Sequence, residues 1–355
     1  MNAQDPIRLT SLAQGGGCGC KIAPGLLSQI LRDQVPTLIP PELLVGLETS
    51  DDAAVYQLNA SQALVATTDF FTPIVDNPYD FGRIAAANAL SDVYAMGAQP
   101  IFALAIAGMP IKQLPVEVIR EILAGGAAIC QQAGIPIAGG HSIDSAEPIY
   151  GLVALGLTSP SQIKRNSSAQ AGDVLILSKP LGVGIYSAAL KRQQLSQADY
   201  QFMLAQCTQL NQPGSHLAQF SQVHAMTDVT GFGLLGHLLE ICRGSRLHAE
   251  ITYAQVPLMP QARQLAAAGY VTGASTRNWA AYGAEVSLCK ELDALAQPIL
   301  ADPQTSGGLL LSCAPEYAAK VLEIFNLQGF HHACVIGHLS AIEPSQAGTV
   351  RVNSA

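Results

Sequence analysis

The sequence predicts an α+β protein of the α/β-sandwich type, built from two domains of similar size. Its 355 residues suggest about two domains. Apolar residues make up 49% of the chain and charged residues only 12%, so the chain can bury a large core. A polar, Ser-rich stretch at 159–173 separates two halves in which strand-type and helix-type patterns occur. We expect a flexible segment at 1–48, a domain at 49–160 and a second domain at 161–355.

The first half is predicted from short apolar runs and amphipathic segments. Before it, residues 26–35 have the spacing of a helix, which the following prolines end. Strands are expected at 54–58, 63–71, 101–109, 135–140 and 149–158. Helices are expected at 81–97 and 115–134, and each of them ends at a glycine.

The second half opens with a strand, a Gly-rich turn and a helix within residues 174–191. A helical pattern is expected at 226–243. A β-α-β pattern follows the turn "DPQTSGGLLL" at 302–311. We therefore predict a second α+β unit after the polar stretch.

Charge and apolar patterning exclude some classes of partner. The formal net charge is −8 and no Lys/Arg cluster occurs, so we expect no nucleic-acid partner. The longest apolar runs are too short to span a bilayer, and the N-terminus lacks the features of a secretory signal. We expect a cytoplasmic protein without a membrane partner, whose eight cysteines are free thiols.

The segment "QGGGCGCKI" at 14–22 places Cys18, Cys20 and Lys21 in a glycine-rich, mobile stretch. A P-loop needs Gly before the Lys and a hydroxyl after it, so that motif is excluded. A zinc site would need a second cysteine pair, and a Cys-x-Cys disulfide would be strained. Two interpretations remain open. Either Lys21 activates a nearby thiol or contacts a phosphate, or the segment is a disordered tail with incidental cysteines.

Five aspartates stand in small or apolar surroundings: Asp51, Asp52, Asp69, Asp92 and Asp228. Buried carboxylates need partners, and too few Lys and Arg residues lie near them to suggest ion pairs. Mg²⁺ with a nucleoside triphosphate would satisfy the group, because Mg²⁺ combines carboxylate and phosphate oxygens. For each aspartate taken alone, a helix cap or a turn is the favoured explanation, whereas for the group it is metal and phosphate binding.

The stretch "IAGGHSID" at 137–144 follows an apolar run with two glycines and His141. Its backbone N–H groups can cradle a phosphate, and His141 can serve as an acid, a base or a hydrogen-bond donor. A plain turn explains the same residues. This stretch therefore leaves phosphate binding open.

Taken together, these motifs resemble those of the selenophosphate synthetase family. "GGGCGCKI", "SDDAAVY", "TTDFFTPIVD", "AGGHSID", "MTDVTGFGLLGH" and "DPQTSGGLLL" occur in the family's order. The resemblance runs from about Arg8 to about residue 340, and the Cys–Lys loop together with "TDFFTPIVD" is specific to the family. The wider architecture resembles the aminoimidazole ribonucleotide synthetase superfamily, which includes thiamine monophosphate kinase.

The resemblance implies that ATP, selenide and water give selenophosphate, orthophosphate and AMP. The product would supply activated selenium for selenocysteine and selenouridine synthesis. Implied partners are ATP, selenide or a protein selenium donor, and a second copy in a homodimer. Implied cofactors are more than one Mg²⁺ ion per site and a monovalent cation such as K⁺. The alternatives are a kinase or cyclo-ligase of the same superfamily, and a non-catalytic nucleotide- or selenium-binding protein.

The resemblance also assigns roles to individual residues. Cys18 matches the catalytic cysteine, and Lys21 matches a lysine that is essential and contacts ATP. The residues that match Mg²⁺ ligands are Asp52, Asp92 and Asp228. Those that match the ATP-binding positions, besides Lys21, are Thr49, Ser50, Asp51, Asp69, Asp92, Gly140, His141 and Ser142. The last three would reach ATP from the second protomer. The case for a role of Cys20 is weaker, and its role stays open.

Overall fold

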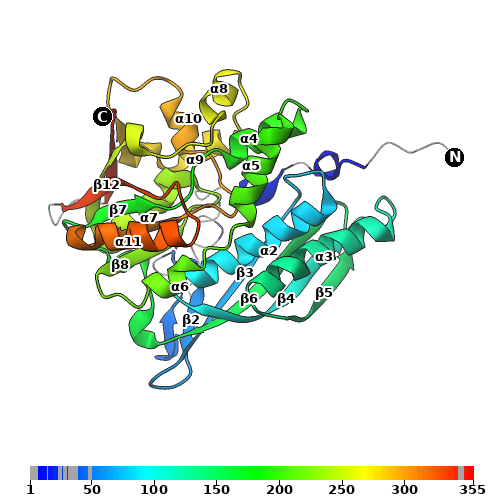
Figure 1. Cartoon of the computed structure of the whole chain (residues 1–355), viewed down its shortest axis with the longest axis horizontal. Coiled ribbons are helices and arrows are strands. Elements are labelled where there is room, and N and C mark those ends of the chain that lie inside the picture. Colours follow the sequence, from blue (N-terminus) through cyan, green and yellow to red (C-terminus); the bar gives the residue numbers. More distant parts are fainter. Residues whose placement is uncertain are drawn as a thin grey trace.

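A computed structural model describes residues 7–13, 15–22, 26, 30, 39–46, 50–342 and 348–355. Thr49 and nearly all of the helix predicted at 26–35 lie outside these residues. The described chain forms two β-sheets with helices packed against them, one sheet in each half of the sequence (Figure 1). Among the described residues, no helix combines the length and the apolar character needed to cross a membrane.

The N-terminal half forms a six-stranded sheet with the order β1-β2-β3-β6-β4-β5. Its strands are β1 (Leu43–Val45), β2 (Ala54–Gln57), β3 (Ala63–Phe71), β4 (Gln99–Met109), β5 (Ile137–Asp144) and β6 (Ile149–Thr158). β4 and β5 pair in parallel, and the other neighbouring strands pair antiparallel. The five strands predicted in this half are therefore confirmed.

Helices α2 (Pro78–Ala95) and α3 (Val116–Gln132) cover one face of this sheet (Figure 1). The Asn77 side chain caps α2 by accepting a hydrogen bond from the Asp80 N–H. The two helices approach closely, because a Cβ on Gly82 would lie 1.9 Å from the Ile122 carbonyl oxygen. The opposite face of the sheet carries exposed side chains, among them Phe70.

The C-terminal half forms a seven-stranded sheet with the order β10-β13-β9-β12-β7-β11-β8. Its strands are β7 (Val174–Leu177), β8 (Val223–Asp228), β9 (Leu247–Thr252), β10 (Val286–Leu288), β11 (Leu309–Cys313), β12 (Cys334–Ala341) and β13 (Thr349–Asn353). Its main helices are α4 (Val183–Lys191), α5 (Gln197–Thr208), α7 (Gly233–Ser245), α9 (Gly273–Tyr282) and α11 (Ala318–Leu327). Shorter ones are α6 (Pro213–Leu217), α8 (Ala262–Ala267) and α10 (Ala296–Leu300).

This second sheet is buried on both faces, which makes the C-terminal half a sandwich. Leu175 and Leu177 of β7 belong to the hydrophobic cluster on the α7 side. Ile176, between them, belongs to the cluster that contains residues of α11. Because successive strand residues point to opposite faces, one short apolar strand contributes to both layers.

One predicted element is wrong in its first residues. The helix expected at 226–243 begins only at Gly233, because Met226–Asp228 form the end of β8. Asp228 pairs with Leu309 of β11, so a partner strand distant in sequence decides the conformation here. Gly233 follows a turn and has φ +70°, a value that favours glycine.

The polar stretch at 159–173 is packed against both halves. Lys164 is buried, and its ammonium group donates hydrogen bonds to the carbonyls of Phe220 (3.1 Å) and Val223 (2.6 Å). The Asn166 side chain donates to the carbonyl of Ser50 at 3.0 Å. The connection between the two predicted domains is therefore held in place by its own polar groups.

Candidate active site

An acidic cluster lies where the two halves of the chain meet. Asp52 precedes β2, Asp92 lies in α2 and Asp228 ends β8. One carboxylate oxygen from each residue lies within 4.8 Å of the other two. Asp92 and Asp228 are buried and Asp52 is half-buried. The structure thus brings together the three aspartates that the sequence analysis matched to Mg²⁺ ligands.

Each of these carboxylates accepts a hydrogen bond from a nearby hydroxyl group. The donors are Thr227 to Asp52 (2.8 Å), Thr67 to Asp92 (2.5 Å) and Ser91 to Asp228. The second carboxylate oxygen of Asp52 is buried without a hydrogen-bond partner among the described residues. The hydroxyls orient the carboxylates but bring no positive charge to the cluster.

The electrostatics of the cluster favour a bound cation. Burial, together with repulsion from Asp228, raises the pKa of Asp52 and of Asp92 well above the usual range. Burial also raises the pKa of Asp228. A hard divalent cation takes carboxylate oxygens as ligands and offsets their mutual repulsion. Three converging carboxylates with one unsatisfied oxygen therefore fit such an ion.

A second polar chain connects the glycine-rich segment to the same site. The Lys21 ammonium lies 3.3 Å from the Asp69 carboxylate, which also accepts a hydrogen bond from the Asn88 side chain at 2.7 Å. The Asn88 carbonyl oxygen accepts from the Cys18 thiol (3.1 Å) and from the Ser306 N–H (2.7 Å). Asp69 thus has a cationic partner, and the expectation that these aspartates lack ion pairs is wrong for it.

Asn88 is the residue that the sequence analysis missed. It is fully buried in α2 and contacts both the Cys18 thiol and the Asp69 carboxylate. The available signal was one amide side chain in the Ala-rich pattern "AAANAL", where a buried polar group needs a partner. The two candidate catalytic groups of the loop are therefore linked through this amide.

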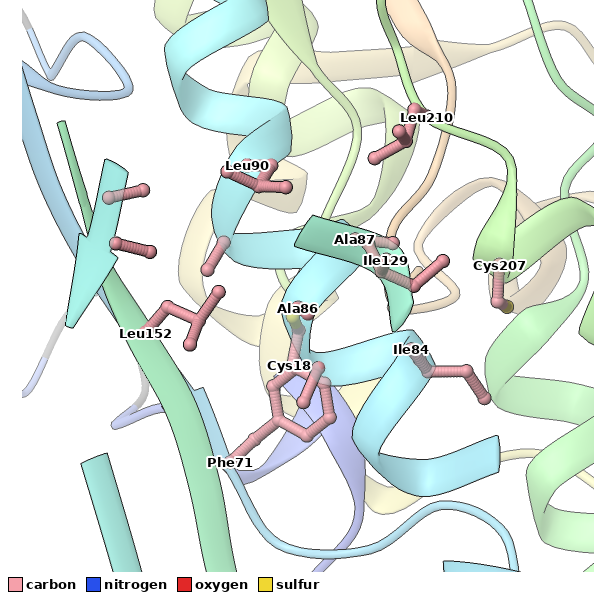
Figure 2. Packing of buried hydrophobic residues seen from close by; sticks show 14 of the residues in the cluster. Cys18, Phe71, Ile84, Ala86, Ala87, Leu90, Ile129, Leu152, Cys207 and Leu210 are labelled. Atoms are coloured by element: carbon pink, nitrogen blue, oxygen red, sulfur yellow. The ribbon is translucent and has the colours of Figure 1, made fainter. Parts of the chain in front are cut away.

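Cys18 is buried, with only 1% of its surface exposed, in the hydrophobic cluster that includes Phe71 and Ala86 (Figure 2). Burial raises the pKa of the Cys18 thiol well above its usual value, and Asp69 raises it further. Lys21 acts in the opposite direction but does not prevail. The interpretation that Lys21 makes this thiol a thiolate is therefore wrong for the arrangement seen here, because desolvation penalises the charged form more.

The loop around Cys18 fits closely into the body of the protein. Residues Gly17–Cys20 form a 3₁₀ turn, in which Gly17 has φ +55°. A Cβ on Gly17 would lie 2.3 Å from the Thr305 hydroxyl oxygen, so a larger residue would push the turn away. The Cys18 N–H donates to that same hydroxyl at 3.1 Å. Cys20 is exposed, and the mobility expected of this segment stays a prediction.

Two candidate ATP-binding residues, Ser50 and Asp51, lie beside the connecting stretch. Asp51 accepts a hydrogen bond from the Asn166 N–H at 2.7 Å. Ser50 has φ +53°, and its carbonyl accepts from the Asn166 side chain. Asp51 therefore faces the connecting stretch, next to Asp52 of the acidic cluster.

The candidate residues 140–142 lie on β5, the edge strand of the N-terminal sheet, and are exposed. Gly140 pairs with Ala105, Ala105 with Leu152, and Leu152 with Asp69. Three strand spacings, about 14 Å in all, therefore separate this segment from Asp69 in one chain. Within a single protomer the structure does not bring these residues to Asp69.

Comparison with known proteins assigns the chain to a family. The family model for the N-terminal domain of AIR synthase related proteins matches residues 50–158, and the model for their C-terminal domain matches 170–346. A relative from Dechloromonas aromatica (strain RCB), named selenide, water dikinase, is 62% identical over 96% of this chain and 98% of its own length. The chain belongs to the selenide, water dikinase family.

Other dikinases of this family match nearly as well. The relative from Paraburkholderia xenovorans (strain LB400) is 62% identical over 94% of each chain. The relative from Rhizobium meliloti (strain 1021) is 54% identical over 96% of this chain and 97% of its own. Both relatives are also named selenide, water dikinase, so the family match extends over almost the whole length.

Solved structures of more distant proteins share the fold of this dikinase family member. Thiamine-monophosphate kinase from Stenotrophomonas maltophilia K279a has a TM-score of 0.62 at 22% identity and covers 95% of this chain and 98% of its own. The hydrogenase maturation protein HypE in complex with ATP has a TM-score of 0.62 at 20% identity, with coverages of 98% and 95%. The predicted two-domain architecture of the aminoimidazole ribonucleotide synthetase superfamily is confirmed.

Proposed function

We propose that this protein converts ATP, selenide and water to selenophosphate, orthophosphate and AMP. The γ-phosphoryl group would pass to selenium. Water would then hydrolyse the remaining nucleoside diphosphate to AMP and orthophosphate. The observation that carries the proposal is the position of Cys18 and Lys21, joined through Asn88 and Asp69, beside an acidic cluster that fits a divalent cation. Membership of the dikinase family supports the identity of the acceptor.

Asp52, Asp92 and Asp228 are the residues that would hold Mg²⁺, as more than one ion per site with the nucleotide. When bound, Mg²⁺ would neutralise triphosphate charge and so favour phosphoryl transfer. Asp69, Ser50 and Asp51 would lie around the nucleotide phosphates, and Thr49 is proposed with them. A monovalent cation such as K⁺ is part of the proposal only through the family resemblance.

Lys21 would supply positive charge to the phosphate that is transferred. In the present arrangement its ammonium contacts Asp69. Partial desolvation lowers the pKa of Lys21, but attraction to Asp69 together with the other acidic groups of the site outweighs this and raises the pKa overall, so the group stays charged. A charged ammonium that moves from a carboxylate to a phosphate loses no charge pairing in the exchange.

Cys18 would meet the selenium substrate. Its thiol proton is held against the Asn88 carbonyl oxygen, and burial keeps the thiol neutral. A neutral thiol in a buried site neither repels an approaching anion nor attacks ATP. All eight cysteines are free thiols in the structure, which suits the reducing cytosol that we propose as the protein's location.

A homodimer is also part of the proposal. Phe70 pairs across the sheet with Gly151, Gly151 with Ile106 and Ile106 with His141, so these residues form one row. Phe70 is 46% exposed at one end of this row, and His141 is exposed at the other. A second copy on this face would bury Phe70 and Ile106 of this row and bring residues 140–142 near the partner's ATP.

The decisive experiment measures AMP and selenophosphate from ATP with and without selenide, at saturating Mg²⁺. We expect AMP formation to depend on selenide and to match selenophosphate one to one. The Cys18→Ser variant should lose selenophosphate formation, while binding of a non-hydrolysable ATP analogue remains. AMP release at the same rate without selenide would contradict the proposal.

Cys20→Ser is the matched control for Cys18→Ser. Cys20 is exposed two positions away in the same turn, and none of the contacts described here uses its thiol. We expect this variant to keep most of its selenide-dependent activity. An equal loss in both variants would mean that the loop, not the Cys18 thiol, is what matters.

A further inference from the structure

A cavity of about 350 Å³ lies behind the glycine-rich loop. We call it the loop cavity. Gly15, Gly16 and Gly19 form its wall on the loop side, and Lys191 of α4, Arg277 of α9 and Thr305 line the rest with their neighbours. The hydroxyl of Thr305 accepts a hydrogen bond from the Cys18 N–H. Because Thr305 also lines the cavity, only one turn of the chain separates the cavity from Cys18.

The charged side chains that are described in the lining of the loop cavity are cationic. None of the described residues that line it is acidic, whereas Lys191 and Arg277 are both cations. The first turn of α9 adds Gly273 and Ala274, whose N–H groups lie at the positive end of that helix. The corresponding N–H groups of α4 are already bound to Asp302 behind the wall. The charge that a ligand meets therefore comes from the two side chains and from α9.

Arg277 lines both the loop cavity and a hollow beside Cys18. A second, smaller hollow is lined by Cys18 and Lys21, and it shares Gly19, Ala274 and Arg277 with the loop cavity. The Arg277 guanidinium donates one hydrogen bond to the Gly19 carbonyl at 3.1 Å, and it has further N–H groups to offer. Arg277 thus lies at the boundary between the cavity and the candidate catalytic thiol.

We propose that the loop cavity receives the selenium substrate as a small anion and passes it to Cys18 by way of Arg277. This inference rests on the proposed function, because selenide is a monoanion at neutral pH. An anion that came from the nucleotide side would meet the triphosphate and the three carboxylates of the acidic cluster. The loop cavity is lined by Arg277 and by Lys191, whose ammonium also donates to the Ala13 carbonyl at 2.9 Å.

A pair of reagents that differ only in charge tests the cavity without selenide or ATP. Iodoacetate is an anion and iodoacetamide is its neutral counterpart, and both alkylate thiols. The ratio of their rates at Cys18 is measured by mass spectrometry in a Cys20→Ser background. Because Cys18 is buried, both reagents need the same opening of the loop, and a change in that opening cancels in the ratio.

In a variant with Lys191→Gln and Arg277→Gln, we expect the iodoacetate-to-iodoacetamide ratio to fall about three- to tenfold. If Arg277→Lys replaces Arg277→Gln in this double variant, the charge at position 277 is kept. Most of the wild-type ratio should then return. Arg192→Gln is the matched control, since Arg192 is an exposed cation beside Lys191 that does not line the cavity. An unchanged ratio in the double variant, or an equal fall in the Arg192 control, would overturn the proposal.

Steady-state kinetics tests the identity of the anion. In the Arg277→Gln variant, the KM for selenide should rise about three- to tenfold while the KM for ATP stays within about twofold. An equal rise in both values would overturn the route, because it would place Arg277 at the nucleotide. The alkylation ratio could fall in the double variant while the wild-type protein makes no AMP with selenide. In that case the loop cavity still admits anions, and the proposed function is wrong.

Discussion

Asp52, Asp92 and Asp228 hold three carboxylates within one small volume, and the hydrogen bonds that described residues donate to them come from hydroxyl groups. Because their pKa values are raised in the folded state, the metal-free protein loses stability as these groups deprotonate with rising pH. A bound divalent cation relieves the repulsion between the three carboxylates. At the scale of single residues, the three carboxylates favour a bound cation and lower the stability of the metal-free protein.

Asp92→Asn separates these two effects. We expect the variant to be more stable than wild type in a chelator at pH 8, by about 1–3 kcal/mol, because one buried charge is removed. Its stabilisation by Mg²⁺ and its Mg²⁺-dependent ATP binding should weaken. Thermal unfolding with EDTA or Mg²⁺, and calorimetry with a non-hydrolysable ATP analogue, measure both. A loss of stability in both buffers with normal ATP binding would mean that Asp92 only anchors Thr67.

At the scale of an element, the Asp302 carboxylate holds the first turn of α4 against the loop before β11. This carboxylate accepts hydrogen bonds from the N–H groups of Gly184 (2.9 Å) and Ile185 (3.3 Å). A Cβ on Gly184 would lie 2.4 Å from the carboxylate, so the helix can approach this closely only with glycine there. Burial raises the pKa of Asp302 to about 7.

A pH series on Asp302→Asn tests this contact. Because the folded-state pKa is raised, the folded wild type binds more protons, and its free energy of unfolding falls as pH rises from about 4 to about 7. Asparagine keeps an acceptor for the N–H groups but cannot ionise. We expect the stability of the variant, relative to wild type, to increase over this window by about 2–4 kcal/mol in denaturant titrations.

Asp293→Asn is the control for that series. Asp293 is exposed, and its pairing with Arg263 lowers its pKa, so its contribution has the opposite sign and is lost as pH falls. The stability of Asp293→Asn relative to wild type should therefore not rise with pH. A flat difference between Asp302→Asn and wild type would show that the Asp302 carboxylate does not ionise in this range.

At the scale of the whole molecule, the two sheets differ in how they are covered. The C-terminal sheet has hydrophobic clusters on both faces. The N-terminal sheet has α2 and α3 on one face (Figure 1). The row from Phe70 to His141 lies on the other face. This asymmetry is the structural basis for the proposed homodimer.

Phe70→Asp should disrupt the proposed homodimer. A charge at position 70 makes burial of this face costly, so we expect a monomer that remains folded. Light scattering after size exclusion measures the mass, and far-UV circular dichroism measures the fold. ATP affinity should fall with the dimer if residues 140–142 of a second protomer reach the nucleotide. Leu327→Asp, at a 79% exposed position on α11, is the control and should change none of these properties.

Local pattern in the sequence predicted most of the elements. The alternation in 63–71 and the spacing in 81–97 reappear as β3 and α2, because strand and helix periodicity follows from which side chains face a core. The start of the helix after β8 was predicted wrongly. Pairing with β11, far along the chain, outweighs the local pattern there. The motifs likewise identified the acidic residues and the Cys–Lys loop as chemically unusual.

The sequence by itself determined which groups are available, and through its motifs it determined the family. Only the tertiary structure decided how these groups act on one another. It joined Asp52, Asp92 and Asp228 from distant segments, linked Cys18 to Asp69 through Asn88, and buried the thiol so that its pKa rises despite Lys21. It also formed the loop cavity. The physical reason is that charge, pKa and access depend on distance and burial, which long-range packing sets and local sequence does not encode.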